Sequence, residues 1–450
     1  MALIRTISGV RGIVGEDLTL EAVYQHAAAF ARLQPPGPIL LARDSRPHGQ
    51  MLMAVASAAL KAQRRRIIVA DIVPTPTAQF LVPSRGLAGA MVLTASHNPV
   101  EYNGMKFIDA DGLFLGGTRT EILFSRADQE QVPEKIDTKH VHGSDLPDAA
   151  GYHIRDVMDL SCIDVEAILR RRFKVVVDTV NGAAHFALPT LLEAFGCEVV
   201  RIHCESNGIF PRGTEPIPEH LTDLGTAVVE HGAQLGLATD PDADRLALVD
   251  ELGQPLGEEY TLVLAVDAFL RRTGSRKPVT TNLSSTMILD EVARRYGLEV
   301  ERSAVGEINV VNLMQANGGA IGGEGNGGVI LAESHLGRDS LVGAALILER
   351  LVQEEATVSQ IKKALPEYHI IKHKVSLAGL DPEVAIRQIA GEYQGVEQND
   401  VDGLKLIWED HWIHIRKSNT EPIIRIIAEA PTPDQGQELI SQIASLVTGQ

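Results

Sequence analysis

The chain has 450 residues, of which 41 are Lys or Arg and 59 are Asp or Glu, so its formal net charge is −18. This acidic balance argues against a general nucleic-acid surface or a surface for anionic membranes, and an anionic substrate would need a local basic pocket. The hydrophobic fraction of 44% and the 40 glycines are typical of a globular α/β enzyme. The length allows about three domains of ordinary size.

The first third of the chain alternates short apolar runs with amphipathic patterns, as repeated βαβ units do. We expect a strand over Ile39–Leu41, a helix over Gly49–Arg64, and strands over Ile67–Val69 and Gly89–Thr94. Polar residues follow the last of these strands. That position is the carboxyl end, where open α/β sheets collect their ligands.

The same alternation continues to the end of the chain. A second unit is predicted to contain strands over Lys174–Asp178, Leu235–Ala238 and Leu246–Val249 and a helix near His185–Phe195. A third is predicted to contain helices over Thr261–Leu270, Met287–Tyr296 and after Asp339, a strand over Pro278–Thr280 and a Gly-rich loop over Gly322–Gly328. The last is predicted to contain strands over Leu404–Trp408, Trp412–Arg416 and Ile423–Ala428 between helices over Pro382–Tyr393 and Asp434–Leu446.

These units predict three similar α/β domains with mixed sheets and a C-terminal α+β domain. A polar stretch over 127–149 separates the first unit from the second. We place the domains at 1–158, 159–254, 255–366 and 367–450.

The cysteines and the first residues of the chain indicate a cytoplasmic protein. The three cysteines, Cys162, Cys197 and Cys204, are odd in number and lack the C-x-x-C spacing of metal sites. The N-terminus lacks the basic and apolar regions of a signal peptide, and no apolar run approaches the roughly 18 residues of a membrane span. We therefore expect reduced thiols, no membrane partner and no nucleic-acid partner.

Ser96 is a candidate nucleophile. It lies in the polar segment Thr94–Pro99, directly after the apolar run Ala90–Leu93, with His97 beside it. Catalytic residues often occupy such loops on a rigid scaffold. A Ser and an Asn that only cap a turn would give the same local pattern.

Three aspartates at alternate positions, Asp240, Asp242 and Asp244, follow another predicted strand. In an extended loop their carboxylates would converge on one side and offer oxygen ligands to a hard divalent ion such as Mg²⁺. A solvated acidic turn is the alternative interpretation. Arg245 adds a donor that could face a substrate oxygen.

The segment Arg416–Pro422 is a candidate phosphate pocket, because it gathers many hydrogen-bond donors between two strands. Its donors are Arg416, Ser418, Asn419 and Thr420, and Arg425 follows them in the next strand. Arg presents a planar fork that matches phosphate oxygens. An ordinary hairpin turn would use similar residues.

Other candidates lie in glycine-flanked loops. Glu324 and Asn326 could bind vicinal hydroxyls, and Arg11 follows Gly9 in Ser8–Gly12. Lys106, near the positive field of Arg side chains, could have its pKa lowered and carry a proton. Lys106 could instead be a solvated surface residue. The arginines of Ser8–Gly12 and of Arg43–Arg46 could belong to Arg–Asp pairs on the surface.

Together and in this order, these segments resemble the α-D-phosphohexomutase family of phosphoglucomutases, phosphomannomutases and phosphoglucosamine mutases. The resemblance covers nearly the whole chain. Its carriers are Ser8–Gly12, Thr94–Pro99, Asn103–Lys106, Asp240–Arg245, Gly323–Gly327 and Arg416–Arg425, with Pro74–Thr77, Asp178–Gly182 and Pro216–Glu219 as further family-like pieces. Each segment alone is a weak signal, but jointly they are highly specific.

The resemblance implies domains around a central cleft and a phosphoserine at Ser96. Asp240, Asp242 and Asp244 would hold Mg²⁺, with a phosphate oxygen on Ser96 as a further ligand. A hexose 6-phosphate or 1-phosphate would bind by its phosphate to Arg416–Thr420 and Arg425, and Glu324 would hold the sugar. Arg11 and Lys106 would stabilise charge and move the proton, and His97 would support the loop.

The sugar loop departs from many members of the family. Many carry Ser where this chain has Asn326, and many carry His where it has Gly328. The loop looks more like archaeal-type members, so we expect a phosphoglucosamine mutase, with phosphomannomutase or phosphoglucomutase as the alternative. A metal-dependent sugar phosphatase and a non-catalytic sugar-phosphate-binding protein are the other classes. The chain is expected to be a monomer or a homodimer.

Overall fold

A computed structural model describes residues 3–133, 143–376, 381–418 and 423–448. The chain divides into two compact units, and each is described by itself. The first unit contains residues 1–268 and 326–359, and the second contains 269–325 and 360–450. Helices α9 (Tyr260–Thr273) and α13 (Val358–Lys363) carry the chain from one unit to the other.

The first unit opens with a mixed sheet whose strand order is β1-β2-β6-β5-β3-β4-β7. Its strands are β1 (Ile4–Thr6), β2 (Gly9–Ile13), β3 (Ile39–Arg43), β4 (Ile67–Ile72), β5 (Gly89–Leu93), β6 (Tyr102–Ile108) and β7 (Gly143–Asp145). Strand β3 runs parallel to β4 and β5, whereas β6 runs antiparallel to both β5 and β2. Because β5 is central, the segment that follows it starts at the carboxyl end of the parallel strands.

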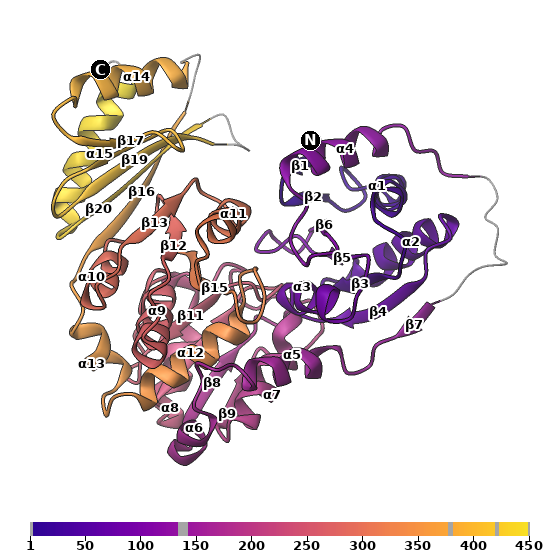
Figure 1. Cartoon of the computed structure of the whole chain (residues 1–450), viewed down its shortest axis with the longest axis horizontal. Coiled ribbons are helices and arrows are strands. Elements are labelled where there is room, and N and C mark those ends of the chain that lie inside the picture. The colour runs from indigo at the N-terminus through magenta and orange to yellow at the C-terminus, as the bar shows by residue number, and fades with distance from the viewer. Residues whose placement is uncertain (1–2, 134–142, 377–380, 419–422, 449–450) are drawn as a thin grey trace. The chain divides into compact units, whose positions relative to one another are not determined.

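Helices cover both faces of this sheet. They are α1 (Leu20–Leu33), α2 (Gly49–Ala62), α3 (Thr75–Ser84), α4 (Gly117–Ala127) and α5 (Ala149–Met158). Alternate residues of β3 enter different cores: Ile39 and Leu41 pack with α1, α2 and α4, and Leu40 and Ala42 pack with α3 and α5 (Figure 1). The doubly covered sheet that the sequence predicts is confirmed.

One buried histidine of this core should make stability depend on pH. Burial lowers the pKa of His26 in α1 to about 4, although its hydrogen bond to the Ala22 carbonyl opposes the shift. The unfolded chain takes up this proton near pH 6.5 and the folded chain only near pH 4, so acid favours unfolding within that window. Relative to His26→Phe, the wild type should lose on the order of 2–3 kcal/mol of unfolding free energy between these pH values. Urea titrations across the window measure this difference, and equal pH slopes in the two proteins would contradict it.

The second sheet has the order β11-β10-β8-β9, with β11 antiparallel to β10 and the other pairs parallel. Its elements are α6 (Val165–Arg171), β8 (Lys174–Asp178), η1 (Ala183–His185), α7 (Ala187–Ala194), β9 (Glu198–Ile202), η2 (Pro218–His220), α8 (Thr222–His231), β10 (Leu235–Thr239) and β11 (Leu246–Val249). The helix predicted near His185–Phe195 is confirmed as α7, which begins at Ala187 and ends at Ala194. The 3₁₀ turn η1 precedes it.

Two further elements complete the first unit. Strand β15 (Gly328–Leu331) packs against α12 (Ser340–Val352), and α12 also packs against α5, α6 and α7. The Gly-rich loop predicted over 322–328 is wrong in extent. Strand β14 (Ile321–Glu324) ends at Glu324 and β15 begins at Gly328, so only residues 325–327 lie outside strands.

The second unit begins with the parallel strands of the third α/β domain. Strand β12 (Val279–Asn282) pairs with β13 (Val300–Ser303) on one side and β14 on the other. Helix α10 (Ile288–Arg295) packs on β13, and α11 (Glu307–Asn317) packs on all three strands. Glu324 therefore ends a parallel strand, as Ser96 follows one in the first unit.

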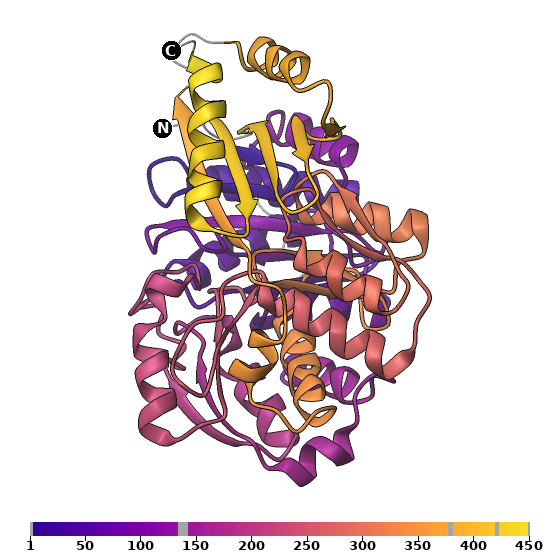
Figure 2. The ribbon, with the colours of Figure 1, turned by 90° about the vertical axis from the view of Figure 1, so that its left-hand side faces the viewer.

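The C-terminal domain is an antiparallel sheet with the order β16-β20-β19-β18-β17. Its elements are β16 (His369–Ser376), α14 (Pro382–Glu392), β17 (Glu397–Asn399), β18 (Leu404–Ile407), β19 (Trp412–Lys417), β20 (Ile423–Ala430) and α15 (Pro433–Thr448). Helix α15 lies along the sheet and packs on β16 and β20 (Figure 2). The predicted α+β domain is confirmed.

In the described part of the chain, no helix is long and apolar enough to cross a membrane. All three cysteines are free thiols, as the sequence predicts, and burial raises the pKa of Cys197 to about 12.

Candidate active site

Ser96 lies in a tightly held turn just beyond β5. Its φ angle is 51°, in the left-handed region that non-glycine residues rarely adopt, and the residue is buried. The Thr94 hydroxyl accepts from the Ser96 N–H at 3.0 Å and donates to Asp44 Oδ2 at 2.6 Å. Arg46 donates to the Ser96 carbonyl at 2.7 Å. The surrounding contacts therefore fix a strained backbone, as is common at functional sites.

The Asp44–Arg46 ion pair that supports this turn is fully buried, so the surface pair considered in the sequence analysis is wrong. The Arg46 Nε lies 3.0 Å from Asp44 Oδ2, and both side chains are inaccessible to solvent. Arg46 also donates to the Asn98 carbonyl at 2.6 Å. The pair acts as a brace beneath the serine turn.

The Ser96 hydroxyl has polar neighbours on two sides. Its Oγ lies 3.3 Å from Asp240 Oδ2 and 3.3 Å from His97 Nδ1. Burial, with the Arg245 charge, lowers the pKa of His97 to about 4, so the imidazole is neutral near pH 7. Burial and the charges of Asp244 and Asp242 raise the pKa of Asp240 well above its usual value. A carboxylate with this environment gains stability from a bound cation.

The three predicted aspartates converge within the first unit. One carboxylate oxygen from each of Asp240, Asp242 and Asp244 lies within 4.8 Å of the others, and all three residues are buried. The convergence does not come from an extended loop, as the sequence analysis assumed. Instead the chain turns: the Ala243 N–H donates to the Asp240 carbonyl at 3.1 Å, and Ala243 has a φ angle of 60°.

Cations and a hydroxyl hold one side of this cluster. Lys106 Nζ donates to Asp242 Oδ2 at 2.6 Å and to Asp244 Oδ2 at 3.1 Å. Arg338 donates to Asp244 Oδ2 at 2.7 Å, and the Thr75 hydroxyl donates to Asp242 Oδ2 at 2.8 Å. Burial opposes ionisation of Asp244, but Arg338 and Lys106 hold the pKa of its carboxyl below the usual range.

The other side of the cluster suits a metal ion. The Oδ1 atoms of Asp242 and Asp244 are buried and, among the described residues, have no hydrogen-bond partner. Unpartnered buried oxygens are costly unless something else satisfies them. Carboxylate oxygens are the ligands that hard divalent cations prefer. The donor set therefore fits a metal cofactor.

Arg11 and Arg245 line the serine turn through contacts within the protein. Arg11 donates to Asn98 Oδ1 at 3.0 Å. Arg245 donates to Glu215 Oε1 at 2.6 Å, and its other terminal nitrogen lies 3.1 Å from His97 Nδ1.

The loop that follows β8 is also strained, and it contacts the acidic loop. Val180 and Asn181 have φ angles of 49° and 55°, and the Ala183 N–H donates to the Pro241 carbonyl at 2.7 Å. A β-branched residue at positive φ is a genuine outlier. Four residues that contact the serine turn or the acidic loop were not predicted individually. Thr75 and Val180 lie in the family-like segments that the sequence identified, and Arg338 and Glu215 were not identified at all.

Glu324, in the second unit, is fixed at the end of β14. It is buried, and its Oε1 accepts from Asn282 Nδ2 at 2.8 Å and from the Gly306 N–H at 3.0 Å. The second predicted sugar contact, Asn326, belongs to the first unit, where its Oδ1 accepts from the Gly328 N–H at 3.2 Å.

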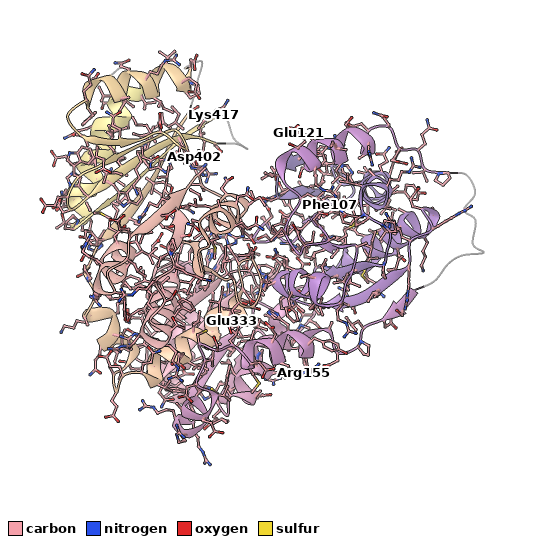
Figure 3. The ribbon with its side chains drawn as sticks, viewed as in Figure 1. Phe107, Glu121, Arg155, Glu333, Asp402 and Lys417 are labelled. Atoms are coloured by element: carbon pink, nitrogen blue, oxygen red, sulfur yellow. The ribbon has the colours of Figure 1, made fainter. Side chains whose placement is uncertain are left out.

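Two arginines face each other across paired strands of the C-terminal sheet. Arg416 in β19 is directly opposite Arg425 in β20. Burial lowers the pKa of Arg416, and nearby Asp402, 3.8 Å away, opposes the shift. Asp402 and Lys417 lie at the same end of this sheet (Figure 3). Two like charges at directly opposite positions repel each other, which an anion would relieve.

The remaining members of the predicted phosphate pocket are only partly described. Ser418 is buried, and its N–H donates to the Ile423 carbonyl at 3.0 Å. Asn419 and Thr420 lie outside the described residues.

Four family models match the chain in sequence. They are described as the α/β/α domains I, II and III and the C-terminal domain of phosphoglucomutase/phosphomannomutase, and they match residues 3–133, 152–253, 257–368 and 352–446.

Whole proteins match over nearly their full length. A phosphoglucomutase/phosphomannomutase of Thermococcus kodakarensis is 35% identical over 96% of this chain and 95% of the relative. A "probable phosphoglucosamine mutase" of Methanopyrus kandleri is 33% identical over 98% and 96%. The crystal structure of a phosphoglucomutase/phosphomannomutase family protein from Burkholderia thailandensis has a TM-score of 0.85 and 26% identity, and the match covers 99% of this chain and 98% of that one.

The chain belongs to the phosphoglucomutase/phosphomannomutase family, the α-D-phosphohexomutases. It is an enzyme that interconverts sugar phosphates by intramolecular phosphoryl transfer. Family membership and the acidic cluster together indicate a metal cofactor.

Proposed function

We propose that Ser96 carries the phosphoryl group of a hexose 6-phosphate/1-phosphate mutase and that Asp240, Asp242 and Asp244 hold Mg²⁺. The observation that supports this most strongly is the position of Ser96 Oγ, 3.3 Å from Asp240 in a cluster of buried carboxylates and cations. When bound, Mg²⁺ would neutralise charge on the transferring phosphoryl group. The protein's own residues position the reacting oxygens.

The reaction has two transfers that restore the enzyme. A free sugar hydroxyl attacks the phosphorus of phosphoserine, the bond from phosphorus to Ser96 Oγ breaks, and the hydroxyl proton leaves. The resulting bisphosphate reorients, and the Ser96 hydroxyl oxygen attacks the phosphorus of the other phosphate. The bond from that phosphorus to the sugar oxygen breaks, the sugar oxygen takes up a proton, the serine hydroxyl gives one up, and phosphoserine is restored. We assign proton movement to Lys106 and charge stabilisation to Arg11, and neutral His97 supports the turn.

The contacts of Lys106 modify one expectation. We expected Arg side chains to set its proton affinity, but Lys106 Nζ forms ion pairs with the carboxylates of Asp242 and Asp244. To accept a proton, the amine must first give one up, and the two carboxylates oppose that loss because they favour the charged ammonium. Lys106 in its charged form can instead donate a proton to a reacting oxygen.

Binding of the substrate is assigned to the second unit. Its phosphate would lie on Arg416, Ser418, Asn419, Thr420 and Arg425, and Glu324 would accept hydrogen bonds from sugar hydroxyls. The opposed arginines and the fixed carboxylate support these roles. We also propose contacts from Arg245 and Asn326.

We propose glucosamine phosphate as the preferred substrate, and mannose or glucose phosphate as the alternative. The name of the Methanopyrus kandleri relative and the archaeal-type sugar loop support this choice. We expect kcat/KM for glucosamine 6-phosphate to exceed that for mannose and glucose 6-phosphates by about tenfold or more, the scale by which one small substrate group changes selection. Parallel assays with one enzyme preparation test this, and equal or reversed values would assign the other sugar.

The competing classes predict different products. A sugar phosphatase would release inorganic phosphate in proportion to substrate consumed, whereas the mutase releases little.

Three expectations stay predictions. They are the domain boundaries at 158/159, 254/255 and 366/367, the cytoplasmic location and the monomeric or dimeric state.

A further inference from the structure

Arg338 is a buried cation of the phosphoryl site that the proposed reaction does not yet use. It lies in the segment between β15 and α12, and its Nη2 donates to Asp244 Oδ2 at 2.7 Å. Asp244 Oδ2 also accepts from Lys106, whereas its Oδ1 has no hydrogen-bond partner among the described residues and lies 3.9 Å from Arg245 Nε. Arg338 therefore fixes the carboxylate by Oδ2, and Oδ1 retains room in its hydrogen-bonding shell for a ligand.

The side chain of Arg338 reaches Asp244 through space that only a glycine leaves open. A Cβ atom on Gly328 would lie 2.2 Å from Arg338 Cδ and 2.8 Å from Cγ, far inside van der Waals contact. The neighbouring Gly327 has a φ angle of 87°, but Gly328 has no such angle, so an alanine there would meet no backbone strain. The Cβ would also lie 3.1 Å from Asn326 Oδ1, a much milder contact, so Arg338 is the side chain that most needs the room at Gly328.

Both sides of Arg338 are anchored. Asp339 caps α12 through the Leu341 N–H at 2.8 Å, and its Oδ2 lies 2.9 Å from His153 Nε2 and 3.0 Å from His335 Nε2. The Ser340 hydroxyl donates to the Ala243 carbonyl at 2.7 Å, which ties this segment to the acidic loop. These contacts set the starting point of the Arg338 side chain.

We propose that Arg338 is a positioning residue of the phosphoryl site, which crosses Gly328 to orient Asp244 so that Oδ1 faces the metal. The inference rests on the proposed role of Asp244 as a metal ligand. Groups that orient a ligand usually matter for metal affinity or activity by about 10- to 100-fold. Gly328 and Arg338 thus act together, because the arginine can reach Asp244 only when residue 328 has no side chain.

A double-mutant cycle tests the device directly. Gly328→Ala should lower kcat/KM by about 10- to 100-fold by displacing Arg338. Arg338→Ala should lower it similarly, and it also removes Cγ and Cδ. Adding Gly328→Ala to Arg338→Ala should therefore change kcat/KM by less than about twofold. Adding it to Arg338→Lys, which keeps a four-carbon stem in the same space, should still reduce activity.

Thermal unfolding supplies a second readout that does not depend on activity. Gly328→Ala should lower the Tm of the wild type and of Arg338→Lys but not that of Arg338→Ala. Gly391→Ala is the matched control, because a Cβ at Gly391 meets nothing within 4 Å. Added guanidinium should partly restore kcat of folded Arg338→Ala, which a purely structural defect would not allow.

Equal losses from Gly328→Ala in all three backgrounds would overturn the inference, and so would full activity of Gly328→Ala alone. If Arg338→Ala does not fold, Arg338→Ser removes the same stem atoms and takes its place in the cycle. These outcomes differ from failure of the proposed function, in which the wild type would show no transfer through Ser96.

Discussion

Replacing Ser96 with alanine is expected to lower kcat for hexose phosphate interconversion by about 10³-fold or more, because no oxygen remains to carry the phosphoryl group. Substrate affinity should change little, since the residues that we assign to substrate binding, Glu324 and Arg416 among them, do not include Ser96. Coupled assays measure kcat, and calorimetry measures the Kd for sugar phosphate.

Ser144→Ala is the matched control for this substitution. Ser144 lies on the exposed strand β7, so its loss should leave both kcat and Kd unchanged. Turnover by Ser96→Ala at the wild-type rate would rule out a phosphoserine. If Ser96→Ala lost both substrate binding and turnover, the serine would instead be a residue that binds the substrate.

Asp242→Asn should have the second-largest effect. The amide keeps the size of the carboxylate but removes a charge from the metal cluster and from the 2.6 Å contact with Lys106. We expect kcat to fall by about 10²- to 10³-fold, the scale seen when one electrostatic group of a catalytic site is lost. The variant should also bind Mg²⁺ more weakly, so that half-maximal activity requires a higher Mg²⁺ concentration than in the wild type.

Asp145→Asn, at an exposed position of β7, controls for the change of one carboxylate to an amide. The wild type should lose its activity in excess chelator and regain it with Mg²⁺. Full activity of the chelated wild type would contradict the assignment of the aspartates to a metal.

Local residue types predicted helices and strands well where their intrinsic preference matches the element that forms. The run Lys174–Asp178 is a strand with the predicted bounds, since its branched apolar residues lie between clear breakers. The glycines of 322–328 were misleading. Glycine is typical of loops, but here Gly322 lies inside β14 and pairs with Thr280 of β12. The Thr280 carbonyl would lie 2.4 Å from an added Cβ, so the strand uses glycine for close approach.

The residues of the site could be predicted from local motifs, but the residues that hold them in place could not. Ser96, Lys106 and the aspartates lie in recognisable segments, whereas the contact of Ser96 with Asp240 depends on how two separate sheets pack, because β5 and β10 belong to different sheets. Arg338 carries no local signal, because its role follows from an empty space at Gly328. The burial of Asp44 and Arg46 likewise depends on the packing of the serine turn over them.

The most direct test of the account is to locate the phosphoryl group itself. The enzyme is incubated with hexose 1,6-bisphosphate, digested and analysed by mass spectrometry, with and without a chase of hexose monophosphate. The account predicts one added phosphoryl group on the peptide that contains Ser96, assigned to Ser96 by fragmentation. When the bisphosphate carries ¹⁸O in its phosphates, a chase with unlabelled monophosphate should replace the heavy group by a light one, because each cycle returns a phosphoryl group to the serine. A fully active enzyme whose Ser96 peptide never carries phosphate would contradict it.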